Sequence, residues 1–266
     1  MKRVFFLCGV LLLLPATAML AQERDPADYE RILFPIAFEG VVPGAFGTQW
    51  QSEILVFNGA SKPLELFPFC VSEVPPSPCR QAETLQPGSW TRNELRASPT
   101  LPSLGAFLYV TKDIAKDASF TSLLHDLSRT DDNAGTEIPI ARERDFRDRI
   151  VLPRVPLRGP FRVALRIYGQ SETPSQARIR MYRLDRLDPF VDETVTLQGL
   201  VTALPVPFPS HPAFFHIFEL VKTYPVLEAA ASVRVEIEAI PPEARLWAFA
   251  SVTNDATQVV TTISPQ

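Results

Sequence analysis

The run FRVALRI at residues 161–167 places apolar side chains at odd positions and small or charged side chains at even positions. Two later runs, ARIRM at 177–181 and VRVEIE at 233–238, repeat this alternation. A period of two residues puts the apolar side chains on one face, which is typical of a half-buried β-strand. Helix signals are scarce because the 26 prolines are spread along the chain. The sequence therefore predicts an all-β protein with short antiparallel strands.

Several strand patterns occur twice, in the same order along the chain. The pairs are ERILFP at 30–35 with DRIVLP at 148–153, SEILVFN at 52–58 with FRVALRI at 161–167, and GAFLYVTKD at 105–113 with LWAFASVTND at 246–255. An ordered repeat of this kind predicts two related domains in tandem. It carries no information about chemistry.

We expect both domains to be antiparallel β-sandwiches, at residues 28–142 and 149–264, because short alternating strands with frequent turn signals favour that architecture. The charged segment 143–148 joins them. It lacks Gly, Ser and Pro, which favours a stiff junction over a flexible tether. The polar segments 58–63 and 169–174 are expected to form matching hairpin loops.

The N-terminus has the three-part pattern of a secretory signal peptide at residues 1–21. A short basic start precedes an apolar run over residues 4–14, and small residues follow. Cleavage after Ala18 or after Ala21 is left open. An uncleaved anchor is disfavoured because the run is too short to span a bilayer. No later segment could cross one, so we expect a periplasmic or secreted mature protein without a transmembrane segment.

Export leaves two cysteines in the mature chain, because Cys8 lies in the apolar core of the signal peptide. Cys70 and Cys79 flank a proline-rich stretch in a chain bound for an oxidising compartment, which predicts a structural disulfide. A zinc site would need more ligands, and the Cys-x-x-Cys spacing of redox proteins is absent.

The charge pattern argues against nucleic acid and draws attention to arginine. The formal net charge is −4, which disfavours nucleic-acid binding. Residues 142–186 nevertheless contain twelve arginines and no lysine. Strand alternation places four of them outward on two strands expected to be adjacent: Arg162, Arg166, Arg178 and Arg180. Such a face could bind an anionic polysaccharide or an acidic partner. The alternative is a salt-bridged surface neutralised by Glu236 and Glu238 across the strands.

Signals for catalysis are weak. Only three histidines occur, His125, His211 and His216, and no nucleophile elbow, zinc-protease motif or phosphate-binding loop accompanies them. We therefore expect a protein that is not an enzyme, with a secreted hydrolase of unrecognised site as an alternative.

One segment offers oxygen ligands at alternate positions beside a glycine. Asp131, Asn133 and Glu137 suit a calcium ion, although the other ligands of an EF-hand are missing. The alternative is a solvated turn, where Asp, Asn and Gly are favoured for backbone reasons. No other cofactor is expected.

Exposed aromatic residues would be needed for carbohydrate binding. The candidates are Trp50, Trp90, Trp247 and Phe46. Aromatic residues of sandwiches more often belong to the core, and Trp247 lies in a strongly apolar run.

The paired ERILFP and DRIVLP openings, together with the closing AFASVTND at 248–255, resemble secreted bacterial proteins built from tandem immunoglobulin-like sandwiches. The tryptophan–disulfide signature of antibody domains is absent. The resemblance implies a fold and not an activity. We expect a secreted, non-catalytic binding or structural module that contacts an unknown protein or glycan at an extracytoplasmic surface, with carbohydrate or polyanion binding by the arginine face as the alternative.

Overall fold

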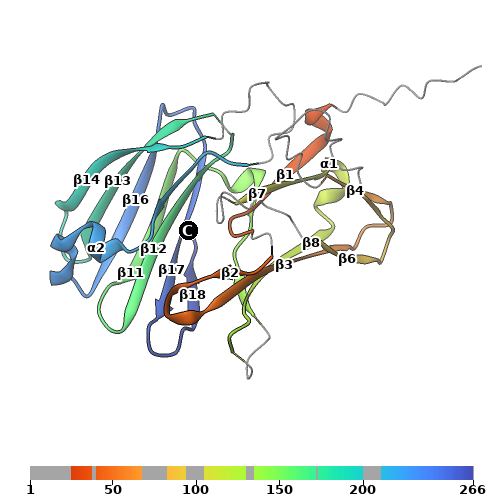
Figure 1. Cartoon of the computed structure of the whole chain (residues 1–266). Coiled ribbons are helices and arrows are strands. Elements are labelled where there is room, and N and C mark those ends of the chain that lie inside the picture. Colours follow the sequence, from red (N-terminus) through yellow and green to blue (C-terminus); the bar gives the residue numbers. More distant parts are fainter. Residues whose placement is uncertain are drawn as a thin grey trace, which may run out of the picture.

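The computed structural model describes residues 25–37, 40–67, 83–93, 105–129, 135–171, 173–199 and 211–265, and the structural statements below concern these residues. The predicted signal peptide and the Cys70–Cys79 pair lie outside them. The regular structure is almost entirely antiparallel β-sheet, as predicted (Figure 1). No helix in this part of the chain is long and apolar enough to cross a membrane.

The N-terminal half, drawn in red to yellow-green in Figure 1, contains two sheets. Sheet 1 has the order β10-β1-β7-β4-β5; in sheet 2, β2 and β6 both pair with β3, which is followed by β8 and β9. The strands are β1 (Tyr29–Phe34), β2 (Val42–Pro43), β3 (Gln49–Asn58), β4 (Leu64–Phe67), β5 (Glu83–Leu85), β6 (Trp90–Asn93), β7 (Ala106–Thr111), β8 (Ala118–Asp126), β9 (Thr136–Ile138) and β10 (Ala141–Arg142).

The C-terminal half, drawn in green to blue, also contains two sheets. Sheet 3 has the order β15-β12-β17-β18 and sheet 4 has the order β11-β16-β13-β14. The strands are β11 (Arg149–Pro156), β12 (Phe161–Gly169), β13 (Ser175–Arg183), β14 (Pro189–Leu197), β15 (Phe214–Ile217), β16 (Ser232–Ile240), β17 (Leu246–Asn254) and β18 (Val260–Ile263). Helices are single turns: α1 (Lys112–Ala115), α2 (Leu220–Thr223), and the 3-10 turns η1 (Pro26–Asp28), η2 (Ala45–Gly47), η3 (Glu143–Asp145) and η4 (Pro225–Ala229).

The two halves share one strand order. β1-β7-β4-β5 matches β11-β16-β13-β14, and β6-β3-β8-β9 matches β15-β12-β17-β18. The first two repeated sequence pairs occupy equivalent strands, namely β1 with β11 and β3 with β12. The third pairing is wrong by one strand, because GAFLYVTKD forms β7, whose counterpart is β16, whereas LWAFASVTND forms β17. Both runs are strongly apolar, and composition alone matched them.

The predicted hairpins are also wrong. The segment after β3 carries the chain from sheet 2 to β4 in sheet 1, and the segment after β12 carries it from sheet 3 to β13 in sheet 4. β3 pairs with β6 and β4 with β7 in the first half, as β12 pairs with β15 and β13 with β16 in the second. Counted without β2 and β10, these are second–fifth and third–sixth pairings, as in immunoglobulin domains. The first strand pairs with the sixth and the seventh with the second, which differs from the immunoglobulin order.

Sheets 3 and 4 pack face to face through the predicted apolar positions. Val163, Leu165 and Ile167 of β12 are buried, and they belong to one hydrophobic cluster with Ile179 and Met181 of β13. The alternation in FRVALRI and ARIRM is therefore confirmed as the signal of half-buried strands.

Sheet 3 is covered on its other face by the N-terminal half. Tyr168, Trp247 and Phe249 project from sheet 3 into the hydrophobic cluster of the first half. The Tyr168 hydroxyl donates a hydrogen bond of 2.6 Å to the backbone oxygen of Pro35. Burial on both faces explains why β17 is continuously apolar at its start and does not alternate.

The junction is bonded to the second half. η3 occupies its first residues, and the backbone of Arg147 exchanges hydrogen bonds of 2.8 and 2.7 Å with that of Leu246. These bonds place the end of the junction against the start of β17.

The Tyr168→Phe variant is expected to lower the free energy of unfolding by about 1 kcal/mol, because it leaves the buried Pro35 oxygen without this donor. Urea unfolding at pH 7 measures the change. Tyr182→Phe, at a buried tyrosine within the second half, is the matched control and should change stability less. Equal losses in the two variants would show that the Tyr168 hydrogen bond contributes nothing.

Candidate binding cleft

The four arginines singled out in the sequence do not form one face. Arg162 and Arg166 lie on β12 of sheet 3, whereas Arg178 and Arg180 lie on β13 of sheet 4. The prediction that these strands are neighbours in one sheet is therefore wrong. Alternation correctly placed all four outside the core between the sheets, but the outer face of sheet 3 meets the N-terminal half and that of sheet 4 does not.

The arginines of sheet 4 are paired with acids. Arg178 donates two hydrogen bonds of 2.7 Å to Asp192, and Arg180 donates one of 2.8 Å to Glu238. The hydrogen bond from Arg178 lowers the pKa of the Asp192 carboxyl. Glu236 is shared by Arg149, Arg180 and Arg234. The outer face of sheet 4 therefore matches the alternative interpretation, a surface neutralised by salt bridges.

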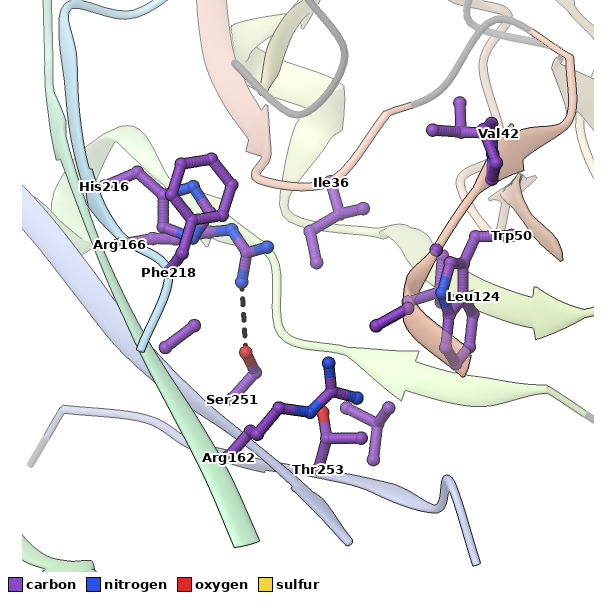
Figure 2. Close-up of a pocket in the computed structure, with 15 residues that line it drawn as sticks. Ile36, Val42, Trp50, Leu124, Arg162, Arg166, His216, Phe218, Ser251 and Thr253 are labelled. Carbon is purple, nitrogen blue, oxygen red and sulfur yellow. Dashed lines mark hydrogen bonds between the residues drawn. The ribbon is translucent and has the colours of Figure 1, made fainter. Parts of the chain in front are cut away.

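Arg162 and Arg166 instead line a cleft of about 400 Å³ between the two halves. One wall comes from the loop and strands around β2, β3 and β8, and the other from β12, β17 and the end of β15 (Figure 2). The labelled residues of the first wall are Ile36, Val42, Trp50 and Leu124; those of the second are Arg162, Arg166, His216, Phe218, Ser251 and Thr253.

The first wall is apolar and is positioned by a tight loop. Gly44 lies so close to Trp50 that a Cβ at this position would stand 2.3 Å from the indole Nε1. Only glycine therefore permits the indole to lie here. Phe46 has the unusual φ of 57° and is 73% exposed, and the guanidinium of Arg162 lies 5.0 Å from its ring centre. This contact joins the loop to the second half.

The charge of Arg162 is compensated. Its Nε donates a hydrogen bond of 2.6 Å to Asp255, and its Nη2 donates one of 3.1 Å to Gln258. These bonds leave the side chain at the rim of the cleft as a neutral ion pair.

Arg166 has no such compensation. Its Nη1 donates a hydrogen bond of 3.0 Å to the Ser251 hydroxyl, and its guanidinium lies 5.7 Å from the ring centre of Phe249. Its Nε is buried without a hydrogen-bond partner. Across the described residues no carboxylate pairs with Arg166, and burial lowers the pKa of its guanidinium. Arginine nonetheless stays protonated in proteins, so the cleft holds an unpaired positive charge.

His216 lies directly across from Arg166 on the neighbouring strand. Its ring packs on Phe218 at a centroid distance of 4.0 Å, and its Nε2 is buried without a partner. Burial, with a further contribution from the Arg166 charge, lowers the pKa of His216 to about 3. The imidazole is therefore neutral at physiological pH and offers one N–H donor.

The three histidines are not brought together. His125 contacts Glu53 at 2.9 Å, and the buried His211 contacts the Gly105 backbone oxygen at 3.1 Å. His216 alone lines the cleft, and no acid lines it with His216. Ser251 thus has no histidine–acid pair of the kind that activates a serine nucleophile.

The remaining predicted site residues are those of the calcium hypothesis. Asp131 and Asn133 of the calcium hypothesis lie outside the described residues, and Glu137 lies exposed on β9. Within the described ranges, no group of three or more His, Cys, Asp or Glu side chains is arranged to hold a metal ion.

The three tryptophans considered for carbohydrate binding differ in their exposure. Trp247 belongs to the core, as predicted, whereas Trp90 is exposed on β6. Trp50 is half-buried and lines the cleft. Sequence reasoning identified Arg166 and Trp50 individually. It did not predict that they lie on opposite walls of one cleft, and it did not identify Phe218. The one sequence signal for the cleft was the set of even positions in FRVALRI, which face away from the core between sheets 3 and 4.

Comparison with known proteins adds little. No family model matches the chain, and no curated protein matches it. A solved structure of infectious bursal virus derived T=1 particles aligns over 91% of this chain and 70% of that one, with 11% identity and a TM-score of 0.19. A similarity of this size supports no inference about fold or function.

Proposed function

We propose that this chain is an exported, non-catalytic binding protein built from two related immunoglobulin-like sandwich domains, and that its ligand binds in the cleft between them. The observation that carries the proposal is the uncompensated guanidinium of Arg166, facing an apolar wall (Figure 2). A buried charge without a partner destabilises a fold. Its presence in a concave site is explained when a ligand supplies the opposite charge.

The domain part of the proposal draws support from the repeated strand order and from the shared second–fifth and third–sixth pairings. The volume supports small-molecule binding, because the cleft falls within the range of roughly 300–1,000 Å³ typical of ligand sites. The earlier polyanion hypothesis needed four coplanar arginines. Two of them are paired with acids on another sheet, so we propose the cleft as the binding site instead of a flat arginine face.

Anilinonaphthalene sulfonate, an anionic aromatic probe that fluoresces in apolar sites, tests the proposal. We expect saturable binding of one probe per chain, and we expect Ala164→Trp to abolish it because the indole fills the cleft that Ala164 lines. Thr194→Trp is the control, since it adds the same side chain at an exposed position of β14. It should bind the probe like the wild type.

Near-ultraviolet circular dichroism must show native packing in all three proteins, because this probe also binds partly folded states. Equal fluorescence from wild type and Ala164→Trp would place the probe elsewhere and would end the proposal.

A further inference from the structure

We propose that the ligand of the cleft is an amphipathic monocarboxylate, such as a medium-chain or aryl-substituted carboxylic acid, whose carboxylate pairs with Arg166 and whose apolar body lies against Trp50. This inference rests on the function proposed above. It adds the chemical class of the ligand and its orientation.

The charge of the ligand follows from the two arginines of the cleft. Arg162 is neutralised by Asp255 at 2.6 Å, and Arg166 has no acidic partner among the described residues. The cleft lining contains no Asp or Glu. One net positive charge matches a monoanion, whereas a phosphate dianion would be left with one charge unpaired in an apolar setting.

The head group follows from the donors around Arg166. The Nη1 atom is engaged with Ser251 and the Nε is buried, whereas the second terminal nitrogen of the guanidinium faces the cleft (Figure 2). The Ser251 hydroxyl accepts that bond, so its own proton remains available, and the neutral His216 adds no second positive charge. Arg166 of β12 and Ser251 of β17 thus offer donors at one end of the cleft, and His216 of β15 lies beside them (Figure 2). A carboxylate has two oxygens that can accept hydrogen bonds from the guanidinium and the hydroxyl together.

The body of the ligand follows from the opposite wall. Ile36, Trp50 and Leu124 stand across from Arg166 and present apolar surface (Figure 2). Sugars would leave hydroxyl groups unpaired against this wall, at a cost in free energy for each group. A chain that is anionic at one end and apolar along its length satisfies both walls.

Calorimetric titration with octanoate, octanol, octylammonium and octyl phosphate tests the assignment, since these probes share one chain and differ in the head group. We expect octanoate to bind at least about tenfold more tightly than octanol, the ratio of one charge-assisted hydrogen bond. Octylammonium should bind most weakly. Octyl phosphate should bind less tightly than octanoate.

The Arg166→Met variant should bind octanoate no better than octanol, with its octanol affinity unchanged. Arg166→Lys retains the charge without the fork and should recover part of the octanoate preference, which also covers the case in which the methionine variant folds poorly. Equal binding of octanoate and octanol by the wild type would overturn the assignment, as would tighter binding of octyl phosphate. If all four probes fail while the naphthalene probe still binds and is blocked by Ala164→Trp, the carboxylate inference is wrong and the proposed function stands.

Discussion

Replacement of Arg166 by methionine is expected to raise the free energy of unfolding by about 1–2 kcal/mol, although it removes a hydrogen bond and a ring contact. Among the described residues the guanidinium bonds only to Ser251, and its buried Nε has no partner, so its desolvation is poorly compensated. Methionine has a similar length, packs against Phe249 and carries no charge. Urea unfolding of ligand-free protein at pH 7 measures the change.

Arg142→Met is the matched control. Arg142 donates hydrogen bonds of 2.8 and 2.6 Å to Glu30 and a third to the Ala115 oxygen, and it is as buried as its partner. Its loss leaves Glu30 unpaired and should destabilise the fold by about 3–5 kcal/mol. Opposite signs for the two variants separate an arginine kept for a ligand from one kept for the fold. If Arg166→Met is destabilising as well, Arg166 has a structural role and the cleft loses its main evidence.

The free energy of unfolding is expected to fall by about 2 kcal/mol between pH 6.5 and 4.5 through His216 alone. Its pKa is about 3 in the folded protein and 6.5 in the absence of burial. Within this window the unfolded chain binds a proton that the folded chain does not, so acid favours unfolding by about 1.4 kcal/mol per pH unit. Above about pH 7.5 the histidine is almost wholly neutral in both states and has little effect.

The comparison of wild type with His216→Asn isolates this contribution, because all other titrating groups are shared. The stability difference between the two proteins should change by about 2 kcal/mol across the window, with the variant less sensitive to acid. His211 contributes in the same direction, since burial lowers its pKa too. The free energy of unfolding should therefore depend even less on pH when both His211 and His216 are replaced by asparagine. Parallel curves for wild type and His216→Asn would show that His216 is not held neutral beside Arg166.

Much of the fold was readable from local patterns. The alternation in FRVALRI predicted which side chains of β12 are buried, and the ERILFP and DRIVLP pair identified equivalent strands in the two halves. The assignment of strands to sheets was not readable. A polar turn reverses the chain in the same way whether the next strand joins the same sheet or the facing one, so Arg166 and Arg180 were placed together although they lie on different sheets.

The candidate site depends on contacts that no local pattern contains. The halves meet through Tyr168, Trp247 and Phe249, which in sequence are only apolar residues of strands. His216 was only one of three histidines weighed for catalysis, and its position opposite Arg166 arises because β15 pairs with β12 across a long intervening segment. Alternation identified Arg166 as outward-facing, but the outward direction proved to be the inner wall of a cleft.

A crystal structure of the protein soaked in 8-bromooctanoate tests the central claim most directly, because the anomalous signal of bromine marks the end of the chain opposite the carboxylate. We predict a bromine peak between Trp50 and Leu124, with the carboxylate against Arg166 and Ser251. An empty cleft at saturating ligand, or a carboxylate bound at Arg178 or Arg180 on the outer face of sheet 4, would contradict the account.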